Sequence, residues 1–390
     1  MKFQHPRRAA SLLAVTLTTL CASATLWSQP APAADSDPDS VANLITSLRL
    51  QEGTTPARER KGWRKPKKIV VLGAASPAQR EAFAAAAPGA KIVVVKDMDA
   101  AAVAATDADV VVGITSYKNI CEPEVIDSAR QLRWILSMSA GVERCIAIAS
   151  VESRDLLVTN LRGVDSAAIA EHAVSLALAL ARGLDTFVTD KNAGRWNRDS
   201  AGATKMQVLN GKTALVVGLG GIGTEVAMRA HALGMKVIAT RNSGRTGPDY
   251  VSYVGPPSEL LTLAKTADVI VNCVPLTTET TGIFNAAFFA VLKPNAFFIN
   301  VARGKSVVTA DLVSALNEHR IAGAGLDVVE PEPLPPDHPL WKSPNLILTP
   351  HISSASDLPP RQRWIIATEN LRRYVAGEKM LSVVDLKREY

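Results

Sequence analysis

The chain has 390 residues, of which 47% are hydrophobic and 21% are charged, and its formal net charge is +6. This length is enough for two separate hydrophobic cores. Beyond its first 30 residues, the sequence has no apolar stretch long enough to cross a membrane, and no internal repeat is visible. The composition therefore argues against a polytopic membrane protein and against a repeat protein.

The N-terminal 33 residues have the anatomy of a secretory signal. A basic start that includes Arg7-Arg8 precedes a mostly apolar stretch at 9–27, and Ala31-Pro32-Ala33 offers a small-x-small cleavage site. Removal of this segment lowers the net charge from +6 to +3. We expect export to the periplasm or the medium, and the arginine pair suggests the twin-arginine route for folded proteins. The alternatives are an uncleaved anchor or a cytoplasmic enzyme with a wrongly chosen start codon.

Residues 34–65 are predicted to form a linker. The stretch 34–57 is rich in Ala, Asp, Pro, Ser and Thr, which favours a tether with one short helix. The basic run at 58–68, RERKGWRKPKK, could meet an anionic membrane surface or nucleic acid. Such runs are more often solvated, and one Trp offers little stacking surface for bases. We therefore predict no nucleic-acid partner and no stable membrane insertion after cleavage.

Two α/β domains are expected after the linker. Apolar runs at 69–72, 92–95, 110–113 and 134–136 alternate with Ala-rich helical segments, which predicts a doubly wound parallel sheet. The predicted fold has two Rossmann-like domains with a substrate cleft between them and a C-terminal helix, at 357–374, that returns to the first domain. The expected boundaries are 66–163 for the substrate domain, 164–345 for the nucleotide domain and 346–390 for the return.

A glycine-rich turn in the second domain predicts a nucleotide site. The apolar run at 212–217 is followed by Gly218, Gly220 and Gly223 in a G-x-G-x-x-G pattern, and a helical pattern begins directly afterwards. The first glycine allows a tight turn, the second lets the backbone approach a pyrophosphate, and the third lets the helix pack closely on the strand. Glycines punctuate many loops, but here both flanks fit a strand–turn–helix unit.

The next strand, at 236–240, points to the cofactor. An NAD enzyme usually carries Asp or Glu at the end of this strand, where the acid binds the ribose hydroxyls. This chain has Arg241, Asn242, Ser243 and Arg245 instead. Guanidinium groups and small polar side chains suit a 2′-phosphate, although a solvated basic loop is the alternative. We predict that NADP(H) is favoured and that NAD(H) is also accepted.

Polar side chains follow three further predicted strands. Arg303 comes after the strand at 296–301, Asp327 and Glu332 come after the strand at 322–326, and His351 comes after the strand at 346–348. Ligands in open α/β sheets bind beyond the carboxyl ends of the strands. Each residue alone could be an ordinary surface ion pair or a loop histidine, but their joint arrival predicts a catalytic set.

The remaining His and Cys residues carry no predicted site. His172 opens an apolar helix and is interpreted as a packed helix residue, and the other histidines lack partners at metal-ligand spacing. The four cysteines, at 21, 121, 145 and 273, form no C-x-x-C pair, and the mature chain would keep three. We therefore predict neither a disulfide framework nor a metal site. Cys273 ends an apolar strand, which does not favour a reactive thiolate.

From about Lys68 to about Leu381, the sequence resembles the D-isomer-specific 2-hydroxyacid dehydrogenase family, especially its glyoxylate/hydroxypyruvate reductase-like branch. The resemblance rests on VVGLGGIGTEVA, NCVPLTTETTGIFN, NVARG, AGAGLDVVEPEPLP and TPHIS. It implies that Arg303 is the catalytic arginine, that Glu332 rather than Glu330 is the acid, and that His351 is the acid–base histidine. It also implies a homodimer.

The resemblance further implies binding roles in both domains. The loop Ala140, Gly141 and Val142 would hold the substrate carboxylate through backbone amides, together with Arg303, and Glu143 replaces the Asp usual after this Gly-Val. Asp327 would contact the nicotinamide side. The residues expected to contact the cofactor are Gly218, Gly220, Gly221, Ile222, Gly223, Arg241, Asn242, Ser243, Val274, Pro275, Thr280, Ala302, Asp327 and Ser353.

The expected reaction is the reduction of a small 2-oxo acid to a D-2-hydroxy acid. Arg303 would bind the carboxylate and polarise the carbonyl, protonated His351 would donate a proton to the oxygen, and Glu332 would orient the imidazole and favour its charged form. A nucleotide-sensing interaction module on the same fold, with little turnover, is the alternative from another class.

Overall fold

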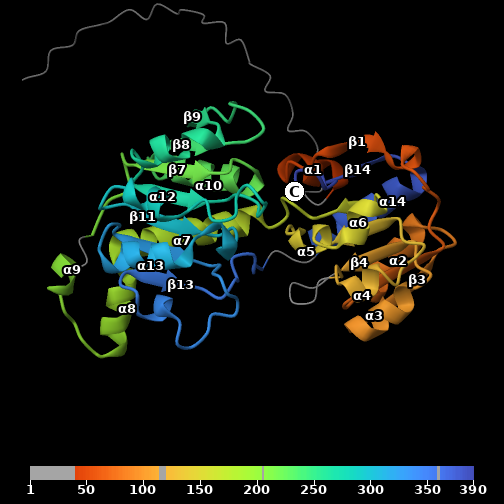
Figure 1. Ribbon diagram of the computed structural model, residues 1–390, viewed down its shortest axis with the longest axis horizontal. Coiled ribbons are helices and arrows are strands. Elements are labelled where there is room, and N and C mark those ends of the chain that lie inside the picture. Colours follow the sequence, from red (N-terminus) through yellow and green to blue (C-terminus); the bar gives the residue numbers. More distant parts are fainter. Residues whose placement is uncertain (1–39, 114–119, 204–205, 358–360) are drawn as a thin grey trace, which may run out of the picture. The chain divides into compact units, whose positions relative to one another are not determined.

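The computed structural model describes residues 40–113, 120–203, 206–357 and 361–390 (Figure 1). The predicted signal segment and its cleavage site therefore lie outside the described residues. Within the described part, two parallel sheets are each covered by helices on both faces. The predicted α/β class with two doubly wound units is confirmed.

The first sheet has five parallel strands in the order β3-β2-β4-β5-β6. The sequence predicts four of them. The fifth, β6, is only three residues long, which is too short to form a recognisable apolar run. The strands are β2 Lys68–Leu72, β3 Lys91–Val95, β4 Val110–Gly113, β5 Trp134–Ser137 and β6 Leu157–Thr159. The helices that follow or connect them are α2 Pro77–Ala86, α3 Met98–Ala105, α4 Pro123–Ile126, α5 Glu143–Ile146 and α6 Ala149–Ser153.

The linker prediction is right about one short helix, but it is wrong about a free tether for the described part of the stretch. Residues of this stretch form α1 (Val41–Ser47), β1 (Glu52–Pro56) and the 3₁₀ turn η1 (Ala57–Glu59). Leu44 and Ala57 are buried in the core of the first domain. The strand β1 pairs antiparallel with β14 (Lys379–Leu381), so the partner of this polar segment lies more than 300 residues away in the sequence. Composition alone cannot reveal such a partner.

The basic run is attached to the first domain rather than free. Arg64 binds the buried carboxylate of Asp109 at 2.7 Å from Nε, and the amide of Lys67 donates to the same carboxylate at 2.7 Å. Arg60 pairs with Asp155 at 3.0 Å, and Lys68 pairs with Asp107. These contacts hold the entry of the chain against β2 and satisfy a carboxylate whose burial would otherwise be costly.

The second sheet has seven parallel strands in the order β13-β12-β11-β10-β7-β8-β9. The order reverses between β7 and β10, which makes this edge a topological switch point. The strands are β7 Thr213–Val217, β8 Lys236–Thr240, β9 Val251–Gly255, β10 Val269–Asn272, β11 Phe297–Asn300, β12 Gly323–Leu326 and β13 Leu346–Leu348. The helices and 3₁₀ turns are α7 Ser166–Arg182, α8 Leu184–Asn192, α9 Ser200–Ala203, α10 Gly221–Ala232, η2 Pro257–Glu259, α11 Leu260–Ala264, α12 Ala286–Ala290, η3 Gly304–Ser306, α13 Thr309–Asn317 and η4 Pro339–Lys342.

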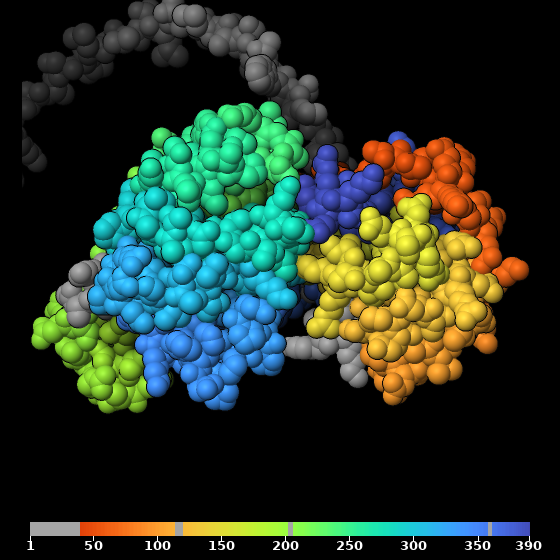
Figure 2. Space-filling model, in the orientation of Figure 1, coloured from red at the N-terminus to blue at the C-terminus, as the bar shows by residue number. Residues whose placement is uncertain are grey.

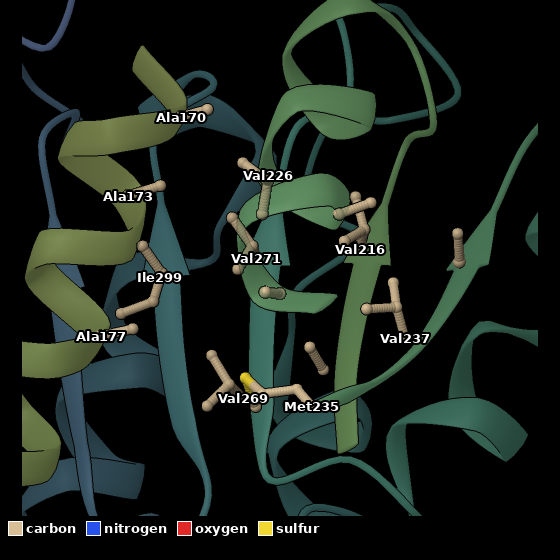
Figure 3. Packing of buried hydrophobic residues seen from close by; sticks show 14 of the residues in the cluster. Ala170, Ala173, Ala177, Val216, Val226, Met235, Val237, Val269, Val271 and Ile299 are labelled. Atoms are coloured by element: carbon tan, nitrogen blue, oxygen red, sulfur yellow. The ribbon is translucent and has the colours of Figure 1, made fainter. Parts of the chain in front are cut away.

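Alternate strand residues face opposite helical layers in this sheet. Val216, Val271 and Ile299 face α7 and α10, whereas their neighbours Leu215, Ile270 and Phe298 face α11, α12 and α13. In Figure 3, Ala170, Ala173 and Ala177 of α7 lie over this face of the sheet, near Ile299 and Val271. Small side chains at this helical spacing let α7 lie close to the strands.

The C-terminal return is confirmed, with a later start than predicted. Residues 346–348 form β13 of the second sheet, so the expected boundary at 346 is too early. The returning helix is α14 (Arg361–Ala376), and its Trp364, Leu371 and Tyr374 belong to the core of the first domain. Trp364 packs edge-on against Phe83 of α2, with ring centroids 5.1 Å apart.

Among the described helices, none by itself has the length and apolar character of a membrane span. The consecutive pair α7 and α8 meets that test only when taken together, and the two are bent by 73° relative to each other.

Candidate active site

Three neighbouring strands bring the predicted catalytic residues together. The last paired residues of β11, β12 and β13 are in register, with Asn300 opposite Leu326 and Leu326 opposite Leu348. Parallel strands in register end at one edge, so the residues that follow them emerge side by side. Arg303, Glu332 and His351 follow these strands, and all three line one cleft of about 2930 Å³.

His351 and Glu332 form a direct pair. The distance from His351 Nδ1 to Glu332 Oε2 is 2.8 Å, and the other carboxylate oxygen of Glu332 accepts a hydrogen bond from the Val329 amide at 2.9 Å. The paired acid is thus Glu332 and not Glu330, as the family resemblance implies. Because Nδ1 is committed to Glu332, Nε2 is the ring nitrogen that remains for a substrate.

The pKa of Glu332 lies below its ordinary value of 4.5. Burial alone would raise this pKa, but the hydrogen bonds from His351 and from the Val329 amide, together with the positive charge of Arg303, outweigh it. The carboxylate therefore stays ionised opposite the imidazole. An ionised acid behind a histidine is the arrangement that general acid–base catalysis requires.

Asp327 holds the loop that carries His351. Its carboxylate accepts hydrogen bonds from the hydroxyl of Thr349 at 2.7 Å and from the amides of Ile352 and Ser353 at 2.9 and 3.0 Å. Its own carbonyl accepts the amide of His351 at 2.8 Å. These bonds outweigh the effect of burial and keep the pKa of Asp327 below its ordinary value. Asp327 lines the cleft, and through its carbonyl it also positions His351. Its contact with the nicotinamide stays a prediction.

The interpretation of His172 as a packed helix residue misses a polar contact. Its Nε2 lies 2.8 Å from the hydroxyl of Thr349, which in turn donates to Asp327. A chain of polar groups therefore runs from α7 through Thr349 to the loop of His351. In the sequence, His172 and Thr349 are 177 residues apart, so no local pattern announces this contact.

Arg303 is held by two acceptors in the cleft. Its Nη1 donates to the carbonyl of Ala302 at 2.8 Å, and its Nε lies 2.9 Å from Glu143 Oε1. A Cβ added at Gly141 would lie 2.0 Å from Nη2 of Arg303, so only glycine lets the guanidinium lie this close to the loop backbone. The sequence gives no sign that Glu143, a substitution in the family pattern, pairs with Arg303.

The predicted substrate loop offers free backbone amides. Its carbonyls have partners, because Ser139 donates to the carbonyl of Gly141 at 3.0 Å and Asn160 donates to that of Ala140 at 2.7 Å. Within the described part of the chain, the amides of Ala140, Gly141 and Val142 donate to no protein acceptor. Three unpaired N–H groups beside a guanidinium suit a carboxylate.

The glycine turn has the geometry that a dinucleotide phosphate needs. Gly218 has φ 94°, which a side chain would disfavour, and a Cβ at Gly223 would meet the carbonyl of Gly218 at 2.1 Å. A Cβ at Gly220 would meet no atom within 4 Å, so the space in front of this residue is open. The helix α10 begins at Gly221, which places its N-terminus at that space. The residues of the turn therefore fit a pyrophosphate.

The two arginines of the predicted phosphate loop lie in different surroundings. Arg241 follows β8, lines the cleft, and is held by the Ser243 hydroxyl at 2.8 Å and the Thr246 carbonyl at 3.0 Å. Arg245 pairs with Glu259 at 2.9 Å and does not line the cleft. Of these two arginines, only Arg241 lies where it could contact a nucleotide bound in the cleft.

Of the residues expected at the cofactor, all but Gly223 line this cleft. Thr280 closes a turn by donating to the carbonyl of Pro275 at 2.6 Å. Desolvation raises the pKa of the Cys273 thiol to about 12, in agreement with the prediction that this thiol is unreactive. The remaining members of the set that line the cleft are Gly221, Ile222, Asn242, Ser243, Val274, Pro275, Ala302 and Ser353.

The cysteine prediction is wrong in one respect. Cys121 and Cys145 form a disulfide, although no C-x-x-C spacing connects them. Cys121 comes after β4 and Cys145 lies in α5, so adjacent strands of the first sheet bring the two together. Among the described cysteines, Cys273 alone is free. No group of three or more His, Cys, Asp or Glu side chains in the described residues could hold a metal ion.

Comparison with known proteins gives one consistent family. Residues 174–353 match the model of the D-isomer specific 2-hydroxyacid dehydrogenase, NAD binding domain. A glyoxylate reductase from Thermofilum pendens is 37% identical over 266 residues, which cover 68% of this chain and 78% of that protein. The glyoxylate reductase/hydroxypyruvate reductase of Mus musculus is 34% identical over 68% of this chain and 81% of its own length.

Solved structures agree with this result. A D-isomer specific 2-hydroxyacid dehydrogenase family protein from Aeromonas salmonicida superimposes with a TM-score of 0.70 at 30% identity, covering 82% of this chain and 99% of that one. An NADPH-dependent glyoxylate/hydroxypyruvate reductase from Sinorhizobium meliloti, solved with NADP and sulfate, gives a TM-score of 0.69 at 27% identity and covers 83% of this chain and 100% of its own.

Proposed function

Because the chain belongs to the D-isomer-specific 2-hydroxyacid dehydrogenase family, we propose that it reduces a small 2-oxo acid, of the glyoxylate or hydroxypyruvate kind, to the D-2-hydroxy acid with NADP(H). The observation that carries this proposal is the His351–Glu332 pair at 2.8 Å, which lines the same cleft as Arg303 and the glycine turn. Acid, cation and nucleotide site are the three parts that the reduction of a 2-oxo acid requires.

Each residue in the cleft has a defined part in the proposed reaction. The amides of 140–142 and the guanidinium of Arg303 bind the substrate carboxylate, and Arg303 also stabilises negative charge that develops on the carbonyl oxygen. His351 donates a proton from Nε2 to this oxygen, while Glu332 fixes the ring through Nδ1. The bound nicotinamide supplies the hydride that the protein itself lacks.

NADP(H) is the proposed cofactor because of the side chain that follows β8. Arg241 stands where an acid would bind ribose hydroxyls, and its guanidinium lines the cleft. The family model names an NAD-binding domain, and the relative from Sinorhizobium meliloti was solved with NADP. We propose that NAD(H) binds in the same place with lower affinity, because it lacks the phosphate that Arg241 would contact.

Turnover by the purified mature chain tests the proposal. Glyoxylate, hydroxypyruvate and a series of longer 2-oxo acids are each supplied with NADPH and with NADH, and oxidation of the cofactor is followed by absorbance. Reduction of one or more of these acids supports the proposed function. Tight NADPH binding without turnover of any of them would contradict it and favour the nucleotide-sensing alternative.

We also propose a homodimer built on the region of α8. Leu184, Val188, Trp196 and Val208 are exposed by 49%, 57%, 97% and 63%, and large apolar residues this exposed within one stretch of the chain favour a protein–protein contact. Figure 2 includes this light-green region at the surface of the molecule. A second copy would cover these side chains. Light scattering of the purified chain and of a Trp196→Glu variant tests this, and a monomeric parent protein would contradict it.

Export remains a proposal, and the disulfide supports it. Disulfides persist in oxidising compartments and are rare where thiols are kept reduced. The Cys121–Cys145 bond is therefore expected in a periplasmic or secreted protein. N-terminal sequencing of the protein from its native host should find a start near Ala34, and recovery of an intact chain from Met1 in the cytoplasm would contradict export.

A further inference from the structure

The disulfide lies at one end of the loop that would bind the substrate. The residues 138–142 connect β5 to α5, and Cys145 is the third residue of that helix. Its partner Cys121 follows β4, the strand beside β5, and the two cysteines are 24 residues apart in the sequence. The bond thus joins the segment after one strand to the segment after its neighbour.

The helix α5 has little of its own to hold it in place. It has four residues and no side-chain hydrogen bond at its N-cap, Val142. A single helical turn is unstable by itself, because nucleation costs more than one turn returns. Both cysteines are buried among the apolar side chains on one face of the first sheet, so the disulfide fixes α5 to the core.

The loop is therefore anchored on two sides. On one side, the Met138 amide donates to the Gly113 carbonyl of β4 at 2.8 Å. On the other side, the Cys145 amide donates to the Val142 carbonyl at 2.8 Å. Val142, which carries the last free amide of the loop, is therefore hydrogen-bonded directly to a cysteine of the disulfide. The three amides that would hold a carboxylate lie between these anchors.

A non-covalent contact joins the same two segments. Arg144 and Glu122, each next to a cysteine in the sequence, form an ion pair at 2.9 Å. The Arg144 side chain is 66% exposed, and exposed pairs of this kind contribute little. This ion pair provides a matched comparison, because its removal leaves the covalent link between the same segments intact.

We propose that the Cys121–Cys145 disulfide is a positioning pair for the substrate loop, so that carboxylate binding depends on the bond while cofactor binding does not. This inference rests on the proposed function, in which the amides of 140–142 hold the carboxylate. Reduction by a phosphine breaks the S–S bond, gives two thiols with two protons from water, and transfers the water oxygen to the phosphine oxide.

The first experiment establishes the bond. Peptide mass spectrometry of the mature chain, digested without reductant, should find the Cys121 and Cys145 peptides linked and Cys273 as a free thiol. Free thiols at 121 and 145 in protein purified from an oxidising compartment would overturn the proposal before any kinetics.

The second experiment compares two variants with the parent chain. In Cys121→Ser/Cys145→Ser, the KM for glyoxylate should rise about tenfold, which corresponds to a loss of about 1.4 kcal/mol in binding, with the Kd of NADPH unchanged. In Glu122→Gln, which keeps the disulfide, the KM should stay within about twofold. A KM unchanged in the double variant, even with a lower Tm, would mean that the bond only stabilises the fold, and would overturn the proposal.

Hydrogen exchange separates this inference from the proposed function. The amides of 138–146 should exchange faster in the double variant, and in parent protein treated with a phosphine, than in the oxidised parent. This readout needs no turnover. If the protein reduces no 2-oxo acid but exchange at these amides rises when the disulfide is reduced, the proposed function fails and the positioning role of the disulfide stands. If exchange does not change in the phosphine-treated parent, in which reduction of the disulfide is verified by mass, the disulfide does not position the loop, whatever the activity.

Discussion

The two sheets use their strand ends in different ways. In the second sheet, the ends of β11, β12 and β13 carry Arg303, Glu332 and His351, so the chemistry lies in side chains. In the first sheet, the end of β5 leads into a loop in which the amides of 140–142 are free, so the chemistry lies in the backbone. A charged side chain can be identified in a sequence. Whether a backbone amide is free cannot, because it depends on whether the fold places a hydrogen-bond acceptor near that amide.

The largest expected effect tests the side-chain edge. His351→Ala removes the proton donor, and kcat for reduction should fall about 10²- to 10⁴-fold, the usual range for a general acid. The Kd of NADPH, measured by fluorescence titration, should change little because no contact of the glycine turn is altered. A kcat within a few-fold of the parent value would show that the proton comes from elsewhere.

The next effect concerns the end of β8 in the same sheet. Arg241→Asp removes a cation and adds an acid that repels a 2′-phosphate and accepts ribose hydroxyl groups. A hydrogen bond to a charged group contributes about 1.5–3 kcal/mol, so kcat/KM with NADPH should fall about 10- to 100-fold while that with NADH rises. Arg245→Ala is the matched control, because Arg245 pairs with Glu259 outside the cleft. A parent enzyme that prefers NADH would contradict the assignment.

The pH dependence of the reductive rate tests the pairing of His351 with Glu332. The depressed pKa of Glu332 means that its carboxylate is fully ionised above its ordinary value of 4.5, and that the contribution of the pair to stability is lost only as the pH falls through the lower folded value. Glu332→Gln removes the charge opposite Nδ1. The alkaline limb of the reductive rate should then move to lower pH, because the negative charge beside the proton donor is gone. An alkaline limb that does not move would mean that Glu332 is not the partner of His351, and Glu330 would be the next residue to test.

The smallest effect tests the contact between the two edges. Glu143 lies on Nε of Arg303, where its negative charge opposes a second carboxylate. Glu143→Gln keeps the shape and removes this repulsion. The pair is partly exposed, and such pairs contribute about 1 kcal/mol or less, so the KM for glyoxylate should fall about two- to fivefold with little change in kcat. Glu143→Asp, which restores the residue usual in the family, provides the comparison. A rise in KM in Glu143→Gln would mean that Glu143 holds Arg303 in its productive position.

Local patterns predict a large part of the fold and of the site. The apolar runs predict four strands of the first sheet and the strands that carry the glycine turn, Arg303 and His351, because buried parallel strands are continuously apolar. The glycine spacing predicts the turn, since its tightest approach, between Gly223 and the carbonyl of Gly218, is made within the turn itself. Contacts between distant residues are not predictable in this way, and they include the pairing of β1 with β14 and the hydrogen bond of His172 to Thr349.

The sequence by itself determines which chemical groups this protein possesses and after which strands they appear. His351, Glu332 and Arg303 are visible because each follows an apolar run, and strand ends of a parallel sheet lie at one edge. Only the tertiary structure decides that Glu143 neutralises Arg303, that Cys121 bonds to Cys145, and that the amides of 140–142 remain free. These features depend on distances between segments from different strands, and no spacing along the chain encodes such a distance.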